Sequence, residues 1–515
     1  MARPVSAVAA TLICLSGAFA ADEPTPKPNL FADEGQNQPA PPPAPRHSSD
    51  EITVTAARRS ALPKLTEPLL LTPQVVVPIP LGLLGEEGIT SLQDGLRNSS
   101  DVSAHGNPST RPGTGVTIRG FDTEFSTYLD GLLDQGPYPR DVFYLDNIEL
   151  FTGPSSVLFG RGATGGAINQ ESKKPHRGDS YSFASQFGTD DTRRLATDDN
   201  FDLGNRWAFR FNGVLNENGV ARRDKVFDQR AGLFPAIAYD GTPFRMNLSW
   251  LHQSDWGLPD LGTPWMDYQG RGRPAPAPWR ANYGFAGDYS RTTANVATLL
   301  LEYDLSEGVT LRNQLRYANY DLAYRFVDSN VPGILPANVD FATVLVNRTV
   351  RSGFQRQDLL ADALDLTAHF ETFGLTHRLV AGVEFDRQAD SPTVYGFSGV
   401  PQAPLLAPDP DAPFVGVRSL QRKSVARIYT DAAYVIDSIT FGDWELLASA
   451  RGDRFDASWQ TDTVAGHSQF RQIDVEPSFR TALTYNATSA VSLYAAYGTS
   501  FDPALEGFLL PAANA

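Results

Sequence analysis

From about residue 180 onward, apolar and polar residues alternate with a period of two over many short stretches, and this pattern limits the folds open to the chain. The alternation predicts β-strands with one apolar and one polar face, which fit a membrane barrel, a sandwich or a propeller. The apolar sets that share a face are Trp207, Phe209, Phe211, Gly213 and Leu215; Phe244, Met246, Leu248 and Trp250; Leu311, Leu315 and Tyr317; Leu379, Ala381, Val383 and Phe385; Ile428, Ala432, Tyr434 and Ile436; and Leu493, Ala495 and Tyr497.

Two further features favour the barrel. Residues 1–20 combine Arg3, an apolar core and the small-residue site Ala18-Phe19-Ala20, which predicts a cleaved signal peptide. The expected connections alternate between short (306–308, 442–443) and long (255–292, 325–355, 387–422), as in transmembrane barrels. No stretch beyond the signal is long and apolar enough for a spanning helix, which needs about 20 residues.

Composition excludes several kinds of site. The net charge of −16 argues against a nucleic-acid partner, because such proteins present basic faces. The single cysteine, Cys14, lies in the predicted signal, so the mature chain is expected to lack disulfides and thiolate metal sites. No Gly-x-Ser-x-Gly elbow and only seven histidines are present, which argues against an exported hydrolase.

The chain is expected to fall into five parts. The signal peptide (1–20) is followed by a Pro-rich extended linker (21–49), by a short strand-forming segment (50–57) and by a compact mixed domain (62–177). The alternating strands occupy 180–515.

Ordered motifs over residues 115–175 carry the most specific information in the sequence. They are Ile118-Arg119-Gly120-Phe121, Tyr128-Leu129-Asp130-Gly131, Ile148-Glu149, Gly153-Pro154-Ser155-Ser156-Val157-Leu158-Phe159-Gly160, Gly165-Gly166-Ala167-Ile168-Asn169 and Lys174-Pro175. This arrangement strongly resembles the plug of TonB-dependent outer-membrane receptors, in the ferric-siderophore branch. Upstream, Ser91-Leu92-Gln93-Asp94-Gly95-Leu96 resembles the early plug helix of that family.

The resemblance implies a mostly β protein with an N-terminal α+β plug domain inside an antiparallel transmembrane β-barrel, located in the bacterial outer membrane. It implies no enzyme activity and no resident cofactor or metal, because the iron is carried by the siderophore. The expected function is import of a ferric siderophore, energised by the inner-membrane proton gradient. The expected partners are the siderophore, a TonB-type energy-coupling protein and outer-membrane lipid.

Site residues also follow from the resemblance. The coupling segment, called the TonB box, is expected at Ile52, Thr53, Val54, Thr55 and Ala56, where an extended peptide can add to a partner's sheet edge. Bulky anionic chelates need cations and aromatic faces, so the plug apices nominate Arg111, Phe125, Tyr138 and Arg140 as ligand-binding residues. The alternative for Arg140 is pairing with Asp141 or barrel acids, and for Tyr138 it is packing against the wall. Trp256, Trp265 and Tyr268 could add an aromatic rim.

Two departures from the family pattern, and one misleading motif, lie in the same region. Thr152 stands where the family usually has Arg, and Gln170-Glu171-Ser172 stands where it has a hydrophobic residue, Thr and Lys; both should alter salt bridges between plug and wall. Residues 160–165 also satisfy G-x-G-x-x-G. A dinucleotide site would need this motif between a strand and a helix, so we interpret these glycines as turn residues.

Other functions remain open at this stage. The ligand could be cobalamin, a sugar or another metal chelate, and a passive porin is a further alternative that the plug motifs disfavour. We count about 13 or 14 strands, whereas plugged transporters have 22. Asn514-Ala515 also lacks the expected aromatic end. We therefore expect a C-terminally truncated barrel, open along one side, with exposed edges and doubtful transport by this polypeptide alone.

Overall fold

The computed structural model describes residues 60, 62–65, 67–69, 72–104, 115–488 and 491–503. The chain divides into two units, Met1–Val54 and Thr55–Ala515, and every described residue belongs to the second unit. The predicted signal peptide, the Pro-rich linker, the coupling residues 52–56 and Arg111 lie outside the described residues.

The plug is an α+β domain, as predicted. Its five-stranded sheet has the order β1-β7-β8-β5-β6, and a second sheet has the order β2-β3-β4. The strands are β1 (Val75–Pro80), β2 (Val102–Ala104), β3 (Val116–Ile118), β4 (Phe121–Asp122), β5 (Thr127–Leu129), β6 (Leu132–Leu133), β7 (Leu145–Thr152) and β8 (Gly166–Ser172). The helices are α1 (Leu81–Glu86), α2 (Leu92–Leu96) and α3 (Ser156–Phe159). The predicted early helix is confirmed as α2, where the Ser91 hydroxyl accepts a hydrogen bond from the Asp94 backbone N–H.

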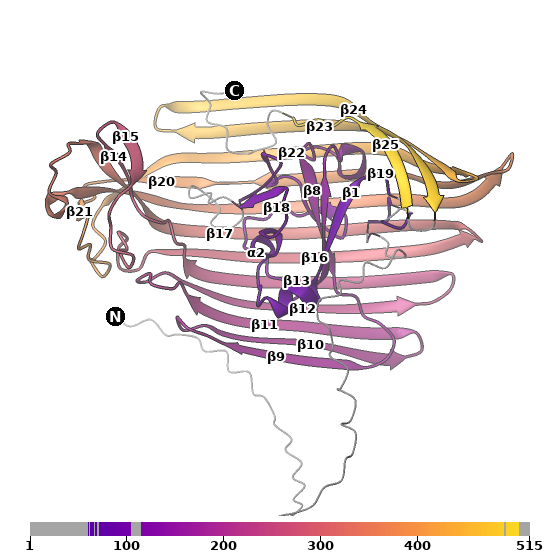
Figure 1. Ribbon diagram of the computed structural model, residues 1–515, viewed down its shortest axis with the longest axis horizontal. Helices are drawn as coiled ribbons and strands as arrows, with labels where there is room; N and C mark the ends of the chain where they lie inside the picture. Colours follow the sequence, from indigo (N-terminus) through magenta and orange to yellow (C-terminus); the bar gives the residue numbers. More distant parts are fainter. Residues whose placement is uncertain are drawn as a thin grey trace, which may run out of the picture. The chain divides into compact units, whose positions relative to one another are not determined.

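Long antiparallel strands form the wall, and the plug lies against its middle (Figure 1). Thirteen wall strands occur among the described residues: β9 (Ser180–Phe187), β10 (Arg193–Gly204), β11 (Trp207–Gly219), β12 (Phe227–Asp240), β13 (Phe244–Leu258), β16 (Tyr289–Ser306), β17 (Val309–Leu335), β18 (Leu345–Thr372), β19 (Leu375–Asp390), β22 (Val417–Phe441), β23 (Trp444–Thr463), β24 (Gly466–Thr488) and β25 (Val491–Gly498). The long connections contain β14 (Trp265–Tyr268), β15 (Arg271–Pro274), a short 3₁₀ helix (Phe341–Thr343), β20 (Thr393–Ser398) and β21 (Ala403–Pro404).

Most connections alternate between short turns and longer loops, which confirms the predicted arrangement at two of its three long positions; the two-residue turn between β23 and β24 is an exception on the long-loop side. The predicted loop at 325–355 is wrong. There β17 continues to Leu335 and β18 begins at Leu345, so only 336–344 joins them. Both strands continue pairing with each other well beyond the predicted end, through Asn330 and Asn347.

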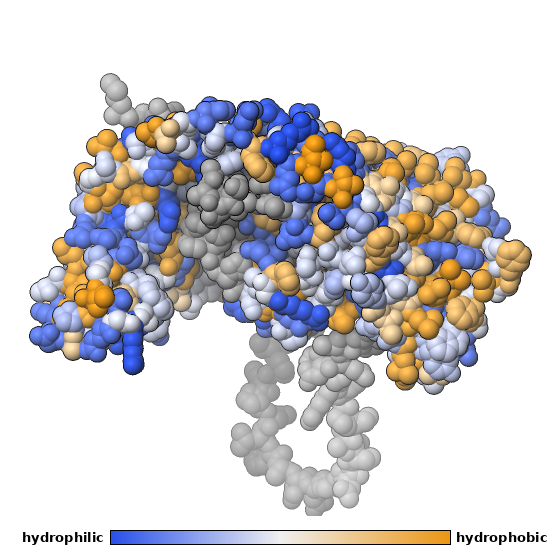
Figure 2. Space-filling model, turned by 90° about the horizontal axis from the view of Figure 1, so that it is seen from above, coloured by the Kyte–Doolittle hydropathy of each residue, from blue (hydrophilic) through white to orange (hydrophobic). Residues whose placement is uncertain are grey.

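Five of the six apolar sets face outward, away from the plug. Trp250, Leu315, Phe385 and Leu493 are between 40% and 63% exposed. The remaining set, on β22, is the exception. Its residues Ile428, Ala432, Tyr434 and Ile436 are all buried, and Tyr434 and Ile436 share a core with plug residues. Figure 2 shows hydrophobic residues gathered at the end of the molecule away from the β14–β15 hairpin. The short turns lie at this same end. An outward apolar band beside the short turns is expected for a transmembrane barrel.

The wall strands follow the order of a closed barrel in which β25 stands next to β9, although the registers given for these two strands among the described residues are with β10 and β24. All residues of β9 are exposed, with Tyr181, Phe183 and Phe187 between 62% and 74%, and β25 exposes Leu493 and Tyr497. Figure 1 places these two strands at opposite margins of the wall. No helix in the described part of the chain is long and apolar enough to cross a membrane.

Candidate functional site

The structure buries Tyr138, which was nominated for ligand binding. Its ring is 1% exposed and stacks on Tyr320 of β17, with 5.7 Å between ring centroids. Its hydroxyl donates to Asp134 Oδ2 at 3.0 Å. Burial raises the pKa of Tyr138, and the charge of Asp134 raises it further, so the phenol stays neutral and acts as a donor. This geometry matches the alternative of packing against the wall.

Arg140 is also engaged inside the plug. Its Nε donates to Asp134 Oδ2 at 2.7 Å, its Nη2 donates to the Asp134 carbonyl at 2.5 Å, and its guanidinium lies 4.8 Å from the Tyr138 ring centre. Burial is the largest influence on Asp134 and opposes its ionisation, but the charge and hydrogen bond of Arg140, together with Arg316 and Tyr320, lower the pKa of that carboxyl. Arg140 therefore pairs with Asp134, and not with its neighbour Asp141 or a barrel acid.

The other nominated aromatic residues are more open to solvent. Phe125 is partly buried, and its carbonyl accepts a hydrogen bond from Gln135 Nε2. Trp265 is 58% exposed on β14, and the guanidinium of Arg273 covers the Tyr268 ring at 3.8 Å. Trp256 was expected in a loop, but it lies in β13, on the outward face that also carries Trp250. The ligand-binding role of Phe125 stays a prediction.

Asp141, which sequence reasoning named only as a partner for Arg140, binds the plug to the wall. Arg194 of β10 donates to both of its carboxylate oxygens, at 2.8 and 2.6 Å, and Arg230 of β12 donates to Oδ2 at 2.9 Å. Arg230 also pairs with Asp255 of β13 and with Asp228 of its own strand, so the cluster joins two arginines and three aspartates. Burial opposes ionisation of Asp141, but these arginines lower its pKa, and it remains a carboxylate.

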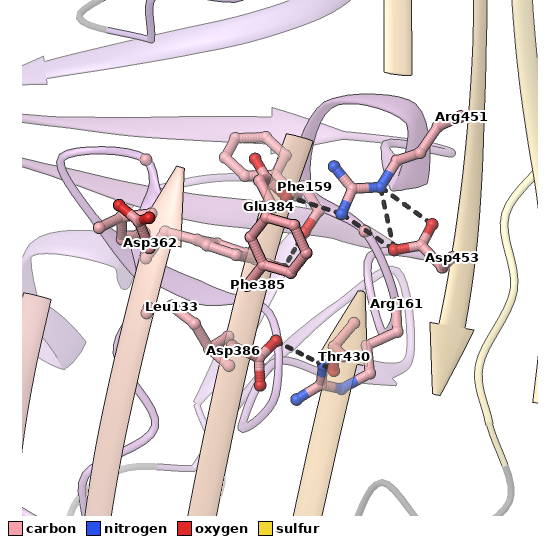
Figure 3. Close-up of a pocket in the computed structure, with 15 residues that line it drawn as sticks. Leu133, Phe159, Arg161, Asp362, Glu384, Phe385, Asp386, Thr430, Arg451 and Asp453 are labelled. Carbon is pink, nitrogen blue, oxygen red and sulfur yellow. Dashed lines mark hydrogen bonds and ion pairs between the residues drawn. The ribbon is translucent and has the colours of Figure 1, made fainter. Parts of the chain in front are cut away.

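A second buried charge cluster links the start of the plug to the opposite part of the wall. Lys64 Nζ pairs with Glu384 of β19 and donates to the Leu158 carbonyl at 2.6 Å. Arg451 of β23 pairs with Glu384 at 2.7 Å and with Asp453 at 2.9 Å (Figure 3). Burial lowers the pKa of Lys64, and the charge of Glu384 opposes this shift. Glu67 forms a further ion pair with Arg378 of β19.

Arg161 extends this contact along the same wall, beside a small cavity. Its Nη1 lies 3.2 Å from Asp386 of β19 and donates to the Thr430 hydroxyl of β22. The cavity measures about 40 Å³ and has walls from the plug and from β18, β19, β22 and β23. Figure 3 shows Arg161, Asp386 and Thr430 on one side of it, with Arg451 and Glu384 on the other.

The glycines of the G-x-G-x-x-G motif form turns, as interpreted. Gly160 and Gly162 have φ values of 86° and 78°, and a Cβ on Gly165 would lie 2.5 Å from the Ile118 carbonyl oxygen. Helix α3 precedes the motif and strand β8 follows it, which is the reverse of the order that a dinucleotide site needs. Among the described residues, no group of three or more His, Cys, Asp or Glu side chains could hold a metal ion.

Comparison with known proteins identifies the family. Residues 68–167 match the TonB-dependent receptor plug domain, and residues 237–512, more than half of the chain, match the TonB-dependent receptor-like β-barrel. The chain belongs to the TonB-dependent receptors. Proteins of this family are outer-membrane receptors and not enzymes, which confirms the predicted family, fold class and localisation.

The TonB-dependent receptors similar to this chain include the catecholate siderophore receptor Fiu of Escherichia coli K12. The two are 29% identical over 86% of this chain and 60% of Fiu. The probable receptor BfrD of Bordetella pertussis is 30% identical over 87% of this chain and 64% of the relative. The crystal structure of the siderophore receptor PiuA from Acinetobacter baumannii gives a TM-score of 0.81 at 27% identity, covering 87% of this chain and 67% of PiuA. The chain thus spans about 60% of the length of the first curated relatives that it matches.

The two departures from the receptor motif have different surroundings. Thr152 is buried at the end of β7, and its hydroxyl has no hydrogen-bond partner among the described residues. Gln170 is fully buried inside the plug, where its amide donates to the Tyr128 carbonyl and to Asp134. In this TonB-dependent receptor, the wall acid Glu384 is paired by Lys64 and Arg451.

Proposed function

We propose that this receptor imports a ferric siderophore across the outer membrane, driven by a TonB-type protein that uses the inner-membrane proton gradient. The observation that carries the proposal is the plug itself. An α+β domain packs against the barrel wall through buried ion pairs, in a chain similar to a receptor named for catecholate siderophores. Such a domain would close a barrel until it moves, so passage of a ligand would require energy from a partner.

The coupling partner is proposed to bind residues 52–56. Ile52 and Val54, with the threonines between and after them, favour an extended strand that can pair with the edge of a partner's sheet. These residues precede Lys64 and Glu67, the first plug side chains with described ion pairs to the wall. A pull from the periplasm would therefore reach these two ion pairs before the rest of the plug.

The ligand is proposed to enter from the side that carries the long loops. Arg111 and Phe125 remain the proposed ligand-contacting residues of the plug, with Trp265 and Tyr268 as an aromatic rim. Tyr138 and Arg140 stay in the proposal only as groups that a ligand could reach after the plug shifts. Outer-membrane lipid is the proposed partner of the outward apolar faces.

Deleting residues 52–56 tests the coupling step. We expect the deletion to abolish uptake of the ferric chelate and to leave binding unchanged, because the ligand-facing residues are not altered. Deleting residues 39–43 from the Pro-rich linker is the matched control and should leave uptake intact. Uptake that survives the loss of 52–56 would refute the coupling assignment.

Titration identifies the ligand. Intrinsic fluorescence of the purified receptor would be followed against ferric catecholates, ferric hydroxamates and cobalamin at nanomolar concentrations. We expect saturable binding of at least one ferric chelate, weakened by Arg111→Gln and not by Arg97→Gln, whose side chain is 69% exposed on the plug. Failure of every ferric chelate, with binding of cobalamin or a sugar, would move the function to another ligand of the same family.

A further inference from the structure

The plug is attached unequally to the two halves of the wall. Its larger apolar core includes wall residues of β11–β18, namely Val214, Phe234, Ala236, Leu251, Ala294, Val296, Ala318, Tyr320, Leu359, Ala361 and Ala363. The smaller core includes fewer wall residues, on β19–β24, namely Val380, Tyr434, Ile436, Leu447 and Ala482. Apolar burial scales with area removed from water, so separation costs more along β11–β18.

The weaker side combines a smaller apolar core with polar contacts, whereas the stronger side has both the larger apolar core and the buried ion pairs of Asp141. The plug meets β19, β22 and β23 through Lys64 and Arg161, which face Glu384, Asp386 and Thr430. These groups can exchange their partners for water when they separate, whereas apolar side chains would be left exposed. The wall surface uncovered on this side would therefore be a hydrophilic strip.

The cavity lies at this same contact. Its volume of about 40 Å³ is enough for a water molecule, and its polar walls offer the partners that a buried water needs. Arg451 is 4% exposed, and its Nη1 has no hydrogen-bond partner among the described residues. A water at this place would satisfy that nitrogen and begin the hydration of the plug–wall contact.

The chain order points to the same wall. Lys64 and Glu67 are the first described plug residues with ion pairs to the wall, and both pair with β19, through Glu384 and Arg378. Asp141, which holds the plug to β10 and β12, comes far later in the chain. A pulling force on the N-terminal segment would therefore act on the contacts with β19 before it acts on those with β10 and β12.

We propose that the plug gives way along β19, β22 and β23 while it stays attached to β10–β18, and that the ligand passes over the strip formed by Glu384, Asp386, Thr430, Arg451 and Asp453. Lys64 is the positioning residue that keeps this side closed. This inference rests on the proposed import function, because it names the surface that the imported ligand would cross.

Two cysteines at equally buried positions test which side opens. Thr430→Cys lies on the proposed strip, and Ser249→Cys lies on β13, on the same face as the core residue Leu251; the native side chains are each 5% exposed. The parent chain has only Cys14, in the predicted signal, so the parent protein serves as the control for background labelling. Labelling of each variant by a small maleimide would be followed in outer membranes, with and without Lys64→Met.

We expect the cysteine at 430 to be labelled faster than the one at 249. Lys64→Met should accelerate labelling at 430 by about ten- to a hundredfold, the effect of losing one buried charge-assisted contact, and leave 249 unchanged. Lys64→Arg keeps the charge and should restore slow labelling at 430. Equal rates at the two positions, or a rise at both with Lys64→Met, would overturn the proposal, because the plug would then loosen as a whole. The assay needs no ligand or coupling partner, so its failure is distinct from failure of ferric-chelate binding.

Discussion

Replacing Asp141 with Asn should loosen the plug more than any other single change to a plug carboxylate that binds the wall. The carboxylate is fully buried and accepts from both terminal nitrogens of Arg194 and from Arg230. Arg194 is itself only 9% exposed and has no other acidic partner among the described residues. Arg230 keeps Asp255 and Asp228, so the substitution leaves mainly Arg194 without a counter-charge.

The expected loss of stability follows from leaving the Arg194 cation without a counter-charge. Removing one partner of a buried ion pair costs about 3–5 kcal/mol, because the remaining charge stays out of water without compensation. Each 1.36 kcal/mol is a factor of ten, so the opening equilibrium of the plug should shift by about two to four orders of magnitude. Asn keeps the shape and can still accept from the Phe143 N–H, which places the expected value nearer the lower limit.

Hydrogen exchange, followed by mass spectrometry on peptides covering 142–152, measures this shift. Asp146→Asn is the matched control, because Asp146 is exposed on β7 in the same peptides. Adding Arg194→Gln to Asp141→Asn removes the stranded charge and should recover part of the protection. Exchange in Asp141→Asn no faster than in Asp146→Asn would refute the claim that this cluster holds the plug.

Three further predictions concern the plug. Gly166→Ala should destabilise the plug by about 2–4 kcal/mol, because φ is +148° and the new Cβ would lie 2.1 Å from the Phe151 carbonyl oxygen on the neighbouring strand. Gly178→Ala is the control, because it has open space around it, and it should lower stability less in the same proteolysis assay. Tyr320→Phe removes the donor to Asp134 and should speed exchange of the plug by about tenfold, the loss of one hydrogen bond to a charged group. Because its pKa is lowered, Asp141 contributes stability above its usual pKa of 3.8 that is lost as pH falls through the folded value, so exchange corrected for its intrinsic pH dependence should be constant from pH 5 to 8 and rise in stronger acid.

The fold was largely predictable because its signals are local. Alternation with a period of two defines strands, and the glycines near Gly160 mark turns with positive φ. The direction of a face is not local. The set on β22 has the same sequence pattern as the outward-facing sets, but Tyr434 and Ile436 pack on the plug. Alternation shows that two faces differ, and only the packing partner decides which one meets lipid.

The burial of Tyr138 and Arg140, two of the four expected ligand-binding residues, was not predictable for a similar reason. A cation and an aromatic residue in a Gly-Pro-rich segment fit an exposed apex, but the segment folds back so that Arg140 reaches Asp134 six residues earlier. The wall contacts of Asp141 and Lys64 have no signal near them in sequence, because Arg194 and Glu384 are separated from them by 53 and 320 residues.

One pattern could nevertheless have pointed to the plug–wall contacts. On β19, Leu379, Ala381, Val383 and Phe385 face outward, so Glu384 and Asp386 must face the interior by alternation alone. Two acids inside a barrel require cations, and the plug supplies Lys64 and Arg161. A domain that must both seal a wall and leave it is better held by such pairs than by apolar surface, because water can replace a charged partner but cannot replace an apolar one. The inward charges of the wall strands are therefore the part of a sequence of this kind from which the plug's attachment can be predicted.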